Sequence, residues 1–140
     1  MDKYLFLEHT ADALFQAFGE NFEELLLNSA EAMLSVIYDV ASVETKKSVK
    51  VNASGDNKEE LLHNFLEAVH LELELKEMVF GKIEITHLDE AKNTLEAELH
   101  GEKMDRKKHN LKTEIKAVTW HSFFVRKEEN KWISQVLVDI

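Results

Sequence analysis

The hydrophobic pattern at the start of the chain predicts a strand followed by a helix. Ala13 to Phe18 is a short apolar and aromatic run that stops at Gly19, which is typical of a strand. Asn21 and Glu24 then form a capping pair, and apolar residues recur at helical spacing over roughly residues 22–38. We therefore expect an amphipathic helix directly after the first strand.

The next part of the chain repeats this strand and helix order. Val49 to Ala53 alternates between apolar and polar residues, which predicts a second strand. Asn57 and Glu60 repeat the capping pair ahead of another apolar stripe. The end of this stripe is ambiguous, because "LELELK" at Leu71 to Lys76 also fits a two-residue period. We expect it to be helical, since Leu73 continues the stripe.

The rest of the chain predicts strands only. They are Val79 to Leu88, Thr94 to His100, Thr113 to Arg126 as one long strand, and Trp132 to Asp139 after a turn at Glu128 to Lys131. The order β-α-β-α-β-β-β-β predicts one α+β domain over residues 1–140. In this two-layer fold, two helices pack on one face of a mixed, mostly antiparallel sheet.

Composition and charge exclude several classes of function. The 140 residues contain no Cys, so disulfides, thiolate metal sites and thiol nucleophiles are excluded. No apolar run is long enough to span a membrane, and the N-terminus does not resemble a signal peptide, so we expect a cytoplasmic protein. The net charge of −10 disfavours strong binding to nucleic acid. Only Lys103 to Lys112, with five basic residues, is a candidate docking patch, and a solvated loop is the alternative.

Polar residues cluster at three places along the chain: Glu8 to Asp12, Gly101 to His109, and Asp139 with the terminal carboxylate of Ile140, backed by Lys116 and His121. Asp12, Asp139 and the Ile140 carboxylate would form an oxygen site for a hard divalent cation if the first and last strands are neighbours. If they are not, Asp12 is a turn residue and Asp139 a solvated chain end.

Other chemistry has less support. Zinc binding by His9, His109 and His121 lacks a paired histidine or cysteine motif, although His9 and Asp12 could supply two ligands. Ser122 next to His121 would point to the opposite face of its strand, and neither a Gly-X-Ser-X-Gly elbow nor a glycine-rich phosphate loop is present. The residues by themselves therefore do not predict an autonomous enzyme.

Several motifs, in order, resemble those of the archease family: "EHTAD", "EELLLNSAEAM", "EELLHNFLEAV", "LHGEKMDRKKH", "TEIKAVTWHSFFV" and the closing "WISQVLVDI". The resemblance implies a non-catalytic protein that activates an RtcB-type tRNA-splicing RNA ligase. It would do so by promoting guanylylation and multiple turnover, with an effect on the nucleotide that the ligase accepts. The alternative that the resemblance leaves open is a chaperone or specificity modulator of a tRNA or RNA methyltransferase. A metal-dependent hydrolase is a third option.

The resemblance also implies functional residues. The family's acidic metal site corresponds to Asp12, Asp139 and the Ile140 carboxylate, with calcium as the expected ion. Its required lysine corresponds to Lys116, and His9 and His121 are further candidates for activating the partner. This chain reads "HTADALF" where the family usually has "HTADIGI", and it has Asn64-Phe65-Leu66 where the family has Trp-Leu. Both changes leave the acidic residues intact.

Overall fold

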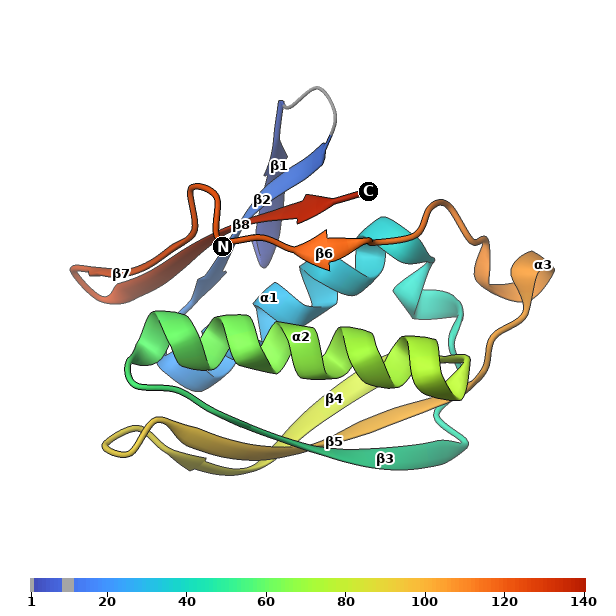
Figure 1. Cartoon of the computed structure of the whole chain (residues 1–140), viewed down its shortest axis with the longest axis horizontal. Helices are drawn as coiled ribbons and strands as arrows, with labels where there is room; N and C mark the ends of the chain where they lie inside the picture. Colours follow the sequence, from blue (N-terminus) through green and yellow to red (C-terminus); the bar gives the residue numbers. More distant parts are fainter. Residues whose placement is uncertain (1, 9–11) are drawn as a thin grey trace.

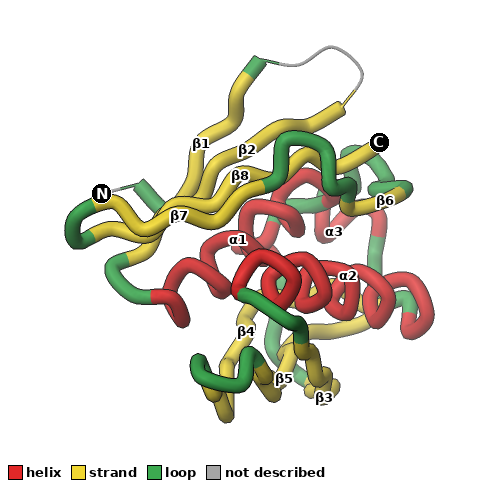
Figure 2. The backbone as a smooth tube through the Cα atoms, turned by 60° about the vertical axis from the view of Figure 1, so that its left-hand side comes forward, coloured by secondary structure: helices red, strands yellow, loops and turns green. Residues whose placement is uncertain are grey.

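Two β-sheets enclose the two long helices, as the cartoon and the tube view both show (Figures 1 and 2). The structure is a computed structural model that describes residues 2–8 and 12–140. Every strand pairing within these residues is antiparallel. The predicted α+β class is therefore confirmed.

The first sheet joins the two ends of the chain. Strand β1 (Tyr4–Leu7) pairs with β2 (Asp12–Gly19), and β2 pairs with β8 (Lys131–Asp139). The other edge of β8 pairs with β6 (Ala117–Val118) near its end and with β7 (Phe124–Glu128) along its first half. The last two predicted strands thus pair with each other across the predicted turn, and β8 lies in the middle of the sheet.

The second sheet lies on the other side of the helices and has the strand order β3-β5-β4 (Figure 1). These strands are β3 (Lys47–Ser54), β4 (Met78–Asp89) and β5 (Thr94–Lys103). The predicted strands over these residues are confirmed, and each extends somewhat further than the sequence pattern indicated.

Both long helices begin where the capping pairs predict. The Oδ1 atoms of Asn21 and Asn57 accept hydrogen bonds of 2.8 Å from the N–H groups of Glu24 and Glu60, respectively. Helix α1 covers Phe22–Ile37 and α2 covers Lys58–Lys76. The "LELELK" segment is therefore helical, as expected.

The predicted single sheet with two helices on one face is wrong, because the structure has three layers. Helix α1 buries side chains around most of its circumference, including Leu25, Ala32 and Leu34. A helix that is apolar on several sides needs cover on several sides. The core accordingly combines residues of the first sheet, such as Phe15 and Val136, with residues of the second sheet and of the helices.

A second correction concerns residues 113–126, which do not form one long strand. They contain β6, a turn that includes His121 and Ser122, and then β7. Ser122 has a left-handed backbone with φ of 55° at this turn. Three short elements were not predicted: β1, a 3-10 turn at Val40–Ser42 and helix α3 (Arg106–His109).

Candidate functional site

Asp12 and Asp139 lie directly opposite each other on the adjacent strands β2 and β8. Opposite residues of an antiparallel pair point to the same face of the sheet, with Cβ atoms about 4.5–5.5 Å apart. Both residues are half-buried. The structure therefore brings together the two acidic side chains that are 127 positions apart in the sequence, given the register pairing.

The pair lies on the face of the first sheet that is turned away from the helices. Ser134, Val136 and Val138 of β8 are buried toward the helices, and the hydroxyl groups of Ser134 and Ser29 of α1 are 2.9 Å apart. Successive side chains of a strand point to opposite faces, so Asp139 points to the outer face. Asp12 shares this face because it is the register partner of Asp139.

Lys116 adjoins the acidic pair through its backbone. Its N–H donates a hydrogen bond of 2.7 Å to the carbonyl oxygen of Asp139, and the next residue, Ala117, is the register partner of Asp139. The Lys116 side chain is exposed. Ile140 is half-buried and packs against the core, so the residue after Asp139 is held in place by apolar contacts.

Of the two histidines predicted to activate the partner, His9 and His121, the structure describes only His121. His121 lies in the turn between β6 and β7, where its side chain is exposed and its N–H donates to Oγ1 of Thr119 at 3.3 Å. This turn follows the two β6 residues that pair with Val138 and Asp139. His9 lies outside the described residues.

The cluster around Glu102 is a buried structural network. Glu102 accepts hydrogen bonds from the N–H of Glu44 at 2.8 Å, from Nε2 of His109 at 3.0 Å and from Nζ of Lys108 at 2.9 Å. Nδ1 of His109 accepts from the N–H of Asp105 at 2.9 Å, so Nε2 carries the proton. These donors, the Glu44 N–H foremost, lower the pKa of Glu102 to about 2. Since both ring nitrogens are engaged, His109 does not fit the zinc alternative.

Glu44 could not be assigned to this network from the sequence, because it lies 58 positions before Glu102. A second contact that sequence reasoning missed involves Trp120, whose ring stacks on that of His63 with centroids 3.8 Å apart and an angle of 7°. The only available signal for this contact was the aromatic run around residues 120–124 in a segment that was predicted to be a strand.

Comparison with known proteins identifies the family. The sequence profile of the Archease protein family (MTH1598/TM1083) matches residues 4–140. The chain belongs to this family. A protein archease of Methanopyrus kandleri is 35% identical over 135 residues and covers 96% of each chain. One from Sulfurisphaera tokodaii is 36% identical over 140 residues with 100% of both chains covered. The solution structure of Methanobacterium thermoautotrophicum protein 1598 superposes with a TM-score of 0.86, at 27% identity and full coverage of both chains.

In this archease the acidic pair fits a hard divalent cation. Two carboxylates directly opposite on neighbouring strands repel each other, and a cation between them would relieve that repulsion. Carboxylate oxygens are the ligands that Ca²⁺ and Mg²⁺ prefer. Asp12 and Asp139 are therefore the side chains of the predicted site that would hold such an ion, and Glu84, Glu98 and His100 of the second sheet are a further group whose ligand atoms lie within 4.8 Å of one another.

Two of the five basic side chains in the segment Lys103 to Lys112 make contacts within the protein. Lys108 contacts Glu102 and Glu44, and Nζ of Lys112 donates to the carbonyl oxygen of Ser35 at 3.1 Å. Asp105 caps α3 by accepting from the N–H groups of Lys107 and Lys108. The exposed cations that remain in this segment are Lys103, Arg106 and Lys107.

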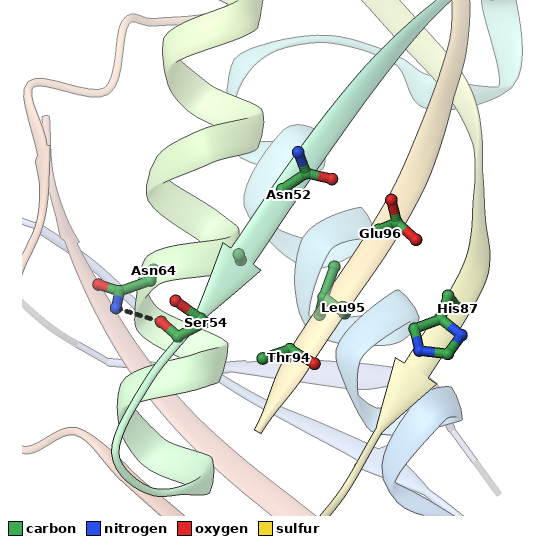
Figure 3. A pocket seen from close by; sticks show the side chains of 8 residues that line it. Asn52, Ser54, Asn64, His87, Thr94, Leu95 and Glu96 are labelled. Carbon is green, nitrogen blue, oxygen red and sulfur yellow. Dashed lines mark hydrogen bonds between the residues drawn. The ribbon is translucent and has the colours of Figure 1, made fainter. Parts of the chain in front are cut away.

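A hollow of about 550 Å³ lies on the second sheet, on the other side of the helices from β2 and β8 (Figure 3). Its polar side chains come mainly from a row across three strands, in which Asn52, Glu96 and His87 are register neighbours. Asn64 of α2 donates to the carbonyl oxygen of Ser54 at 2.7 Å at its edge. None of the predicted site residues lines this hollow.

Among the described residues, no helix has both the length and the apolar character needed to cross a bilayer.

Proposed function

We propose that this archease is a non-catalytic, cytoplasmic cofactor of an RtcB-type tRNA-splicing ligase. It activates the ligase by promoting guanylylation and multiple turnover, and thereby acts in tRNA processing. The observation that carries the proposal is the register pairing of Asp12 with Asp139 at the end of two adjacent strands, in a member of the archease family. This arrangement presents acidic groups to a partner instead of enclosing a substrate.

The chemistry of nucleotidyl transfer explains why such groups would help. The reaction depends mainly on positioning and on neutralising phosphate charge. A divalent cation, expected to be calcium, supplies that neutralisation when it is bound. The β2 and β8 strands hold the Asp12 and Asp139 carboxylates on one face, and Ile140, the residue after Asp139, packs against the core. Ligands contributed to the nucleotide site in this way would also affect which nucleotide the ligase accepts.

Lys116 supplies the opposite charge next to this pair. Its backbone is fixed to Asp139, while its side chain stays exposed. A lysine ammonium is a compact cation on a flexible stem, so it can pair with a carboxylate or with a phosphate. In the proposed complex, Lys116 stabilises phosphate charge at the edge of the acidic pair.

The proposal is tested by reconstituting ligation with the purified ligase. Asp12→Asn and Asp139→Asn keep the side-chain shape and remove one negative charge each. Glu96→Gln is a matched control, because it removes the same charge from the exposed face of the second sheet. We expect both Asp variants to lose most of the stimulation of guanylylation and multiple turnover, and the control to retain it. Stimulation at the wild-type level by both Asp variants would falsify the proposal. The methyltransferase alternative predicts an effect on the methyltransferase that does not depend on these two carboxylates.

A further inference from the structure

The outer side of α2 carries an apolar ridge that the core does not use. Leu71 and Leu75 are 55% and 69% exposed. They are four residues apart, and the half-buried Ala68 is one turn before Leu71, so all three share one side of the helix. Leu71 and Leu75 are the two most exposed large hydrophobic side chains among the described residues.

This ridge is separate from the side of α2 that packs into the protein. The buried side chains of α2 are Leu61, Leu62, His63, Phe65, Leu66, Val69 and Leu73. A helix that served only the core would carry polar residues opposite these positions. Apolar residues on two sides of α2 also explain why "LELELK" fits two periods.

An ordered aromatic side chain lies at the other end of α2. Trp120 is 53% exposed, and its ring stacks on His63, which is only 2% exposed. Phe123 contacts both rings, with centroid distances of 5.0 Å to Trp120 and 5.2 Å to His63. Nε2 of His63 donates to the carbonyl oxygen of Val118 at 3.0 Å. A tryptophan that is held in place before binding is the kind of anchor that contributes most to interfaces.

The charge around the ridge defines the partner. The exposed residues Glu67 and Glu74 border it, each in contact with a histidine one turn earlier, and residues 58–77 contain six glutamates but only two lysines. A second copy of this chain would bring the same acidic border and would be repelled. A partner with apolar side chains flanked by lysine or arginine fits both the ridge and its border.

Strand β6 connects this surface to the acidic pair. Ala117 of β6 pairs with Asp139, and Val118, the next residue, accepts the hydrogen bond from His63 of α2. Figure 1 accordingly shows β6 between the C-terminal end of β8 and α2. Two consecutive residues of β6 therefore link the strand that carries Asp139 to helix α2.

We propose that the α2 surface, formed by Ala68, Leu71 and Leu75, binds a basic amphipathic helix of the partner protein. That the partner is the ligase rests on the proposed function. The α2 surface then supplies affinity, while the acidic pair supplies activation. These are separable roles, so they can be measured separately.

The first test uses a peptide and does not depend on the ligase. The probe is a labelled synthetic peptide with leucine and lysine at helical spacing, and a second peptide of equal charge has glutamine in place of leucine. We expect Leu71→Gln/Leu75→Gln, which keeps the protein charge, to weaken binding of the first peptide about tenfold or more by fluorescence anisotropy. Leu5→Gln/Leu7→Gln is the control for two partly exposed leucines elsewhere. Equal affinity of the wild type and the α2 variant for the leucine peptide would overturn the proposal, as would tight binding of the glutamine peptide.

The second test titrates the protein into the ligation assay. We expect Leu71→Gln/Leu75→Gln to raise the concentration for half-maximal stimulation about tenfold and to leave the maximum unchanged. Asp139→Asn should lower the maximum instead. An unchanged half-maximal concentration for the α2 variant overturns the assignment of this surface to the ligase. If the wild type does not stimulate the ligase, the proposed function fails, and the peptide result alone decides whether the α2 surface binds a basic helix.

Discussion

His109 donates a hydrogen bond of 3.0 Å from Nε2 to Oε2 of Glu102, and both residues are buried. The same carboxylate receives the N–H of Glu44, which precedes β3, and the ammonium of Lys108 in α3. One ionised side chain therefore links β5 to α3, which follows it closely in the sequence, and to the segment before β3, 58 positions earlier. This relationship makes the protein sensitive to acid at a defined position.

Stability should fall at low pH because Glu102 must be ionised to accept these bonds. Its pKa is about 2 in the folded protein and 4.5 as the ordinary value. A lowered folded-state pKa stabilises the fold above the unfolded value, and this stabilisation is lost as the pH falls from 4.5 through 2. Urea unfolding at several pH values should show a steeper loss for the wild type than for Glu102→Gln over this range. Parallel curves would show that Glu102 does not carry the effect.

Replacing His109 tests the network without removing its charge. His109→Ala leaves the Asp105 N–H without its side-chain acceptor, removes one donor from Glu102 and opens a cavity at a fully buried position. We expect a loss of about 2–4 kcal/mol in the free energy of unfolding, measured by denaturant titration. Lys107→Ala, at an exposed position in the same short helix, should change it by less than about 0.5 kcal/mol. A small effect of His109→Ala would mean that the network contributes little to stability.

Calcium should stabilise the wild type through the acidic pair. Ligand binding to the folded state raises its stability in proportion to the logarithm of ligand concentration over Kd. We expect Ca²⁺ to raise the melting temperature of the wild type and of Glu96→Gln, and to have little effect on Asp139→Asn. Calorimetric titration should show at least about tenfold weaker Ca²⁺ binding for the Asp139 variant. Equal shifts in all three proteins would place the ion elsewhere.

Extending the chain beyond Ile140 tests the third carboxylate. A short Gly-Ser tail converts the Ile140 carboxylate into an amide and leaves Asp12 and Asp139 unchanged. We expect weaker Ca²⁺ binding and weaker ligase stimulation, because one anionic oxygen ligand is lost. The same tail at the N-terminus is the control. Unchanged calcium affinity in the C-terminally extended protein would remove Ile140 from the proposed site.

Lys116 offers a test that separates the side chain from the fold. Its contact with Asp139 is made by the backbone N–H, so Lys116→Ala keeps that hydrogen bond. We expect a normal melting temperature and a reduced rate of ligase guanylylation, with partial recovery in Lys116→Arg because the charge is restored. Lys50→Ala removes an exposed lysine of β3, outside the basic segment, and should leave the rate unchanged. Full activity of Lys116→Ala would exclude a role for its ammonium group.

The helices could be predicted because their signals are local. Asn21 with Glu24 and Asn57 with Glu60 each lie within one helical turn, and both pairs form the predicted caps. The predicted strand over residues 113–126 was wrong because its interruption depends on distant contacts. Trp120 stacks on His63 of α2 instead of continuing a strand, and β-propensity in the sequence contains no information about that contact.

The candidate site was only partly predictable. The residue types of Asp12 and Asp139 suggested oxygen ligands, but their adjacency depends on the pairing of β2 with β8, which spacing alone cannot determine. The division of the strands into two sheets could not be predicted either. An alternating pattern shows which residues of a strand face the core, but it does not show with which other strand it pairs. The only sign of the α2 surface in the sequence was that Leu71 to Lys76 fits both a helical and a two-residue period.

The central position of β8 has a consequence for the order of folding. β8 is the final strand of these 140 residues, yet β2, β6 and β7 all pair with it. The side-chain contact of Gln16 with Gln135 spans 119 positions, so the first sheet depends on very long loops being closed. Proteins with such distant pairings fold slowly. During synthesis, β1 and β2 emerge early, and the edge of β2 that pairs with β8 stays unpaired until β8 has been made.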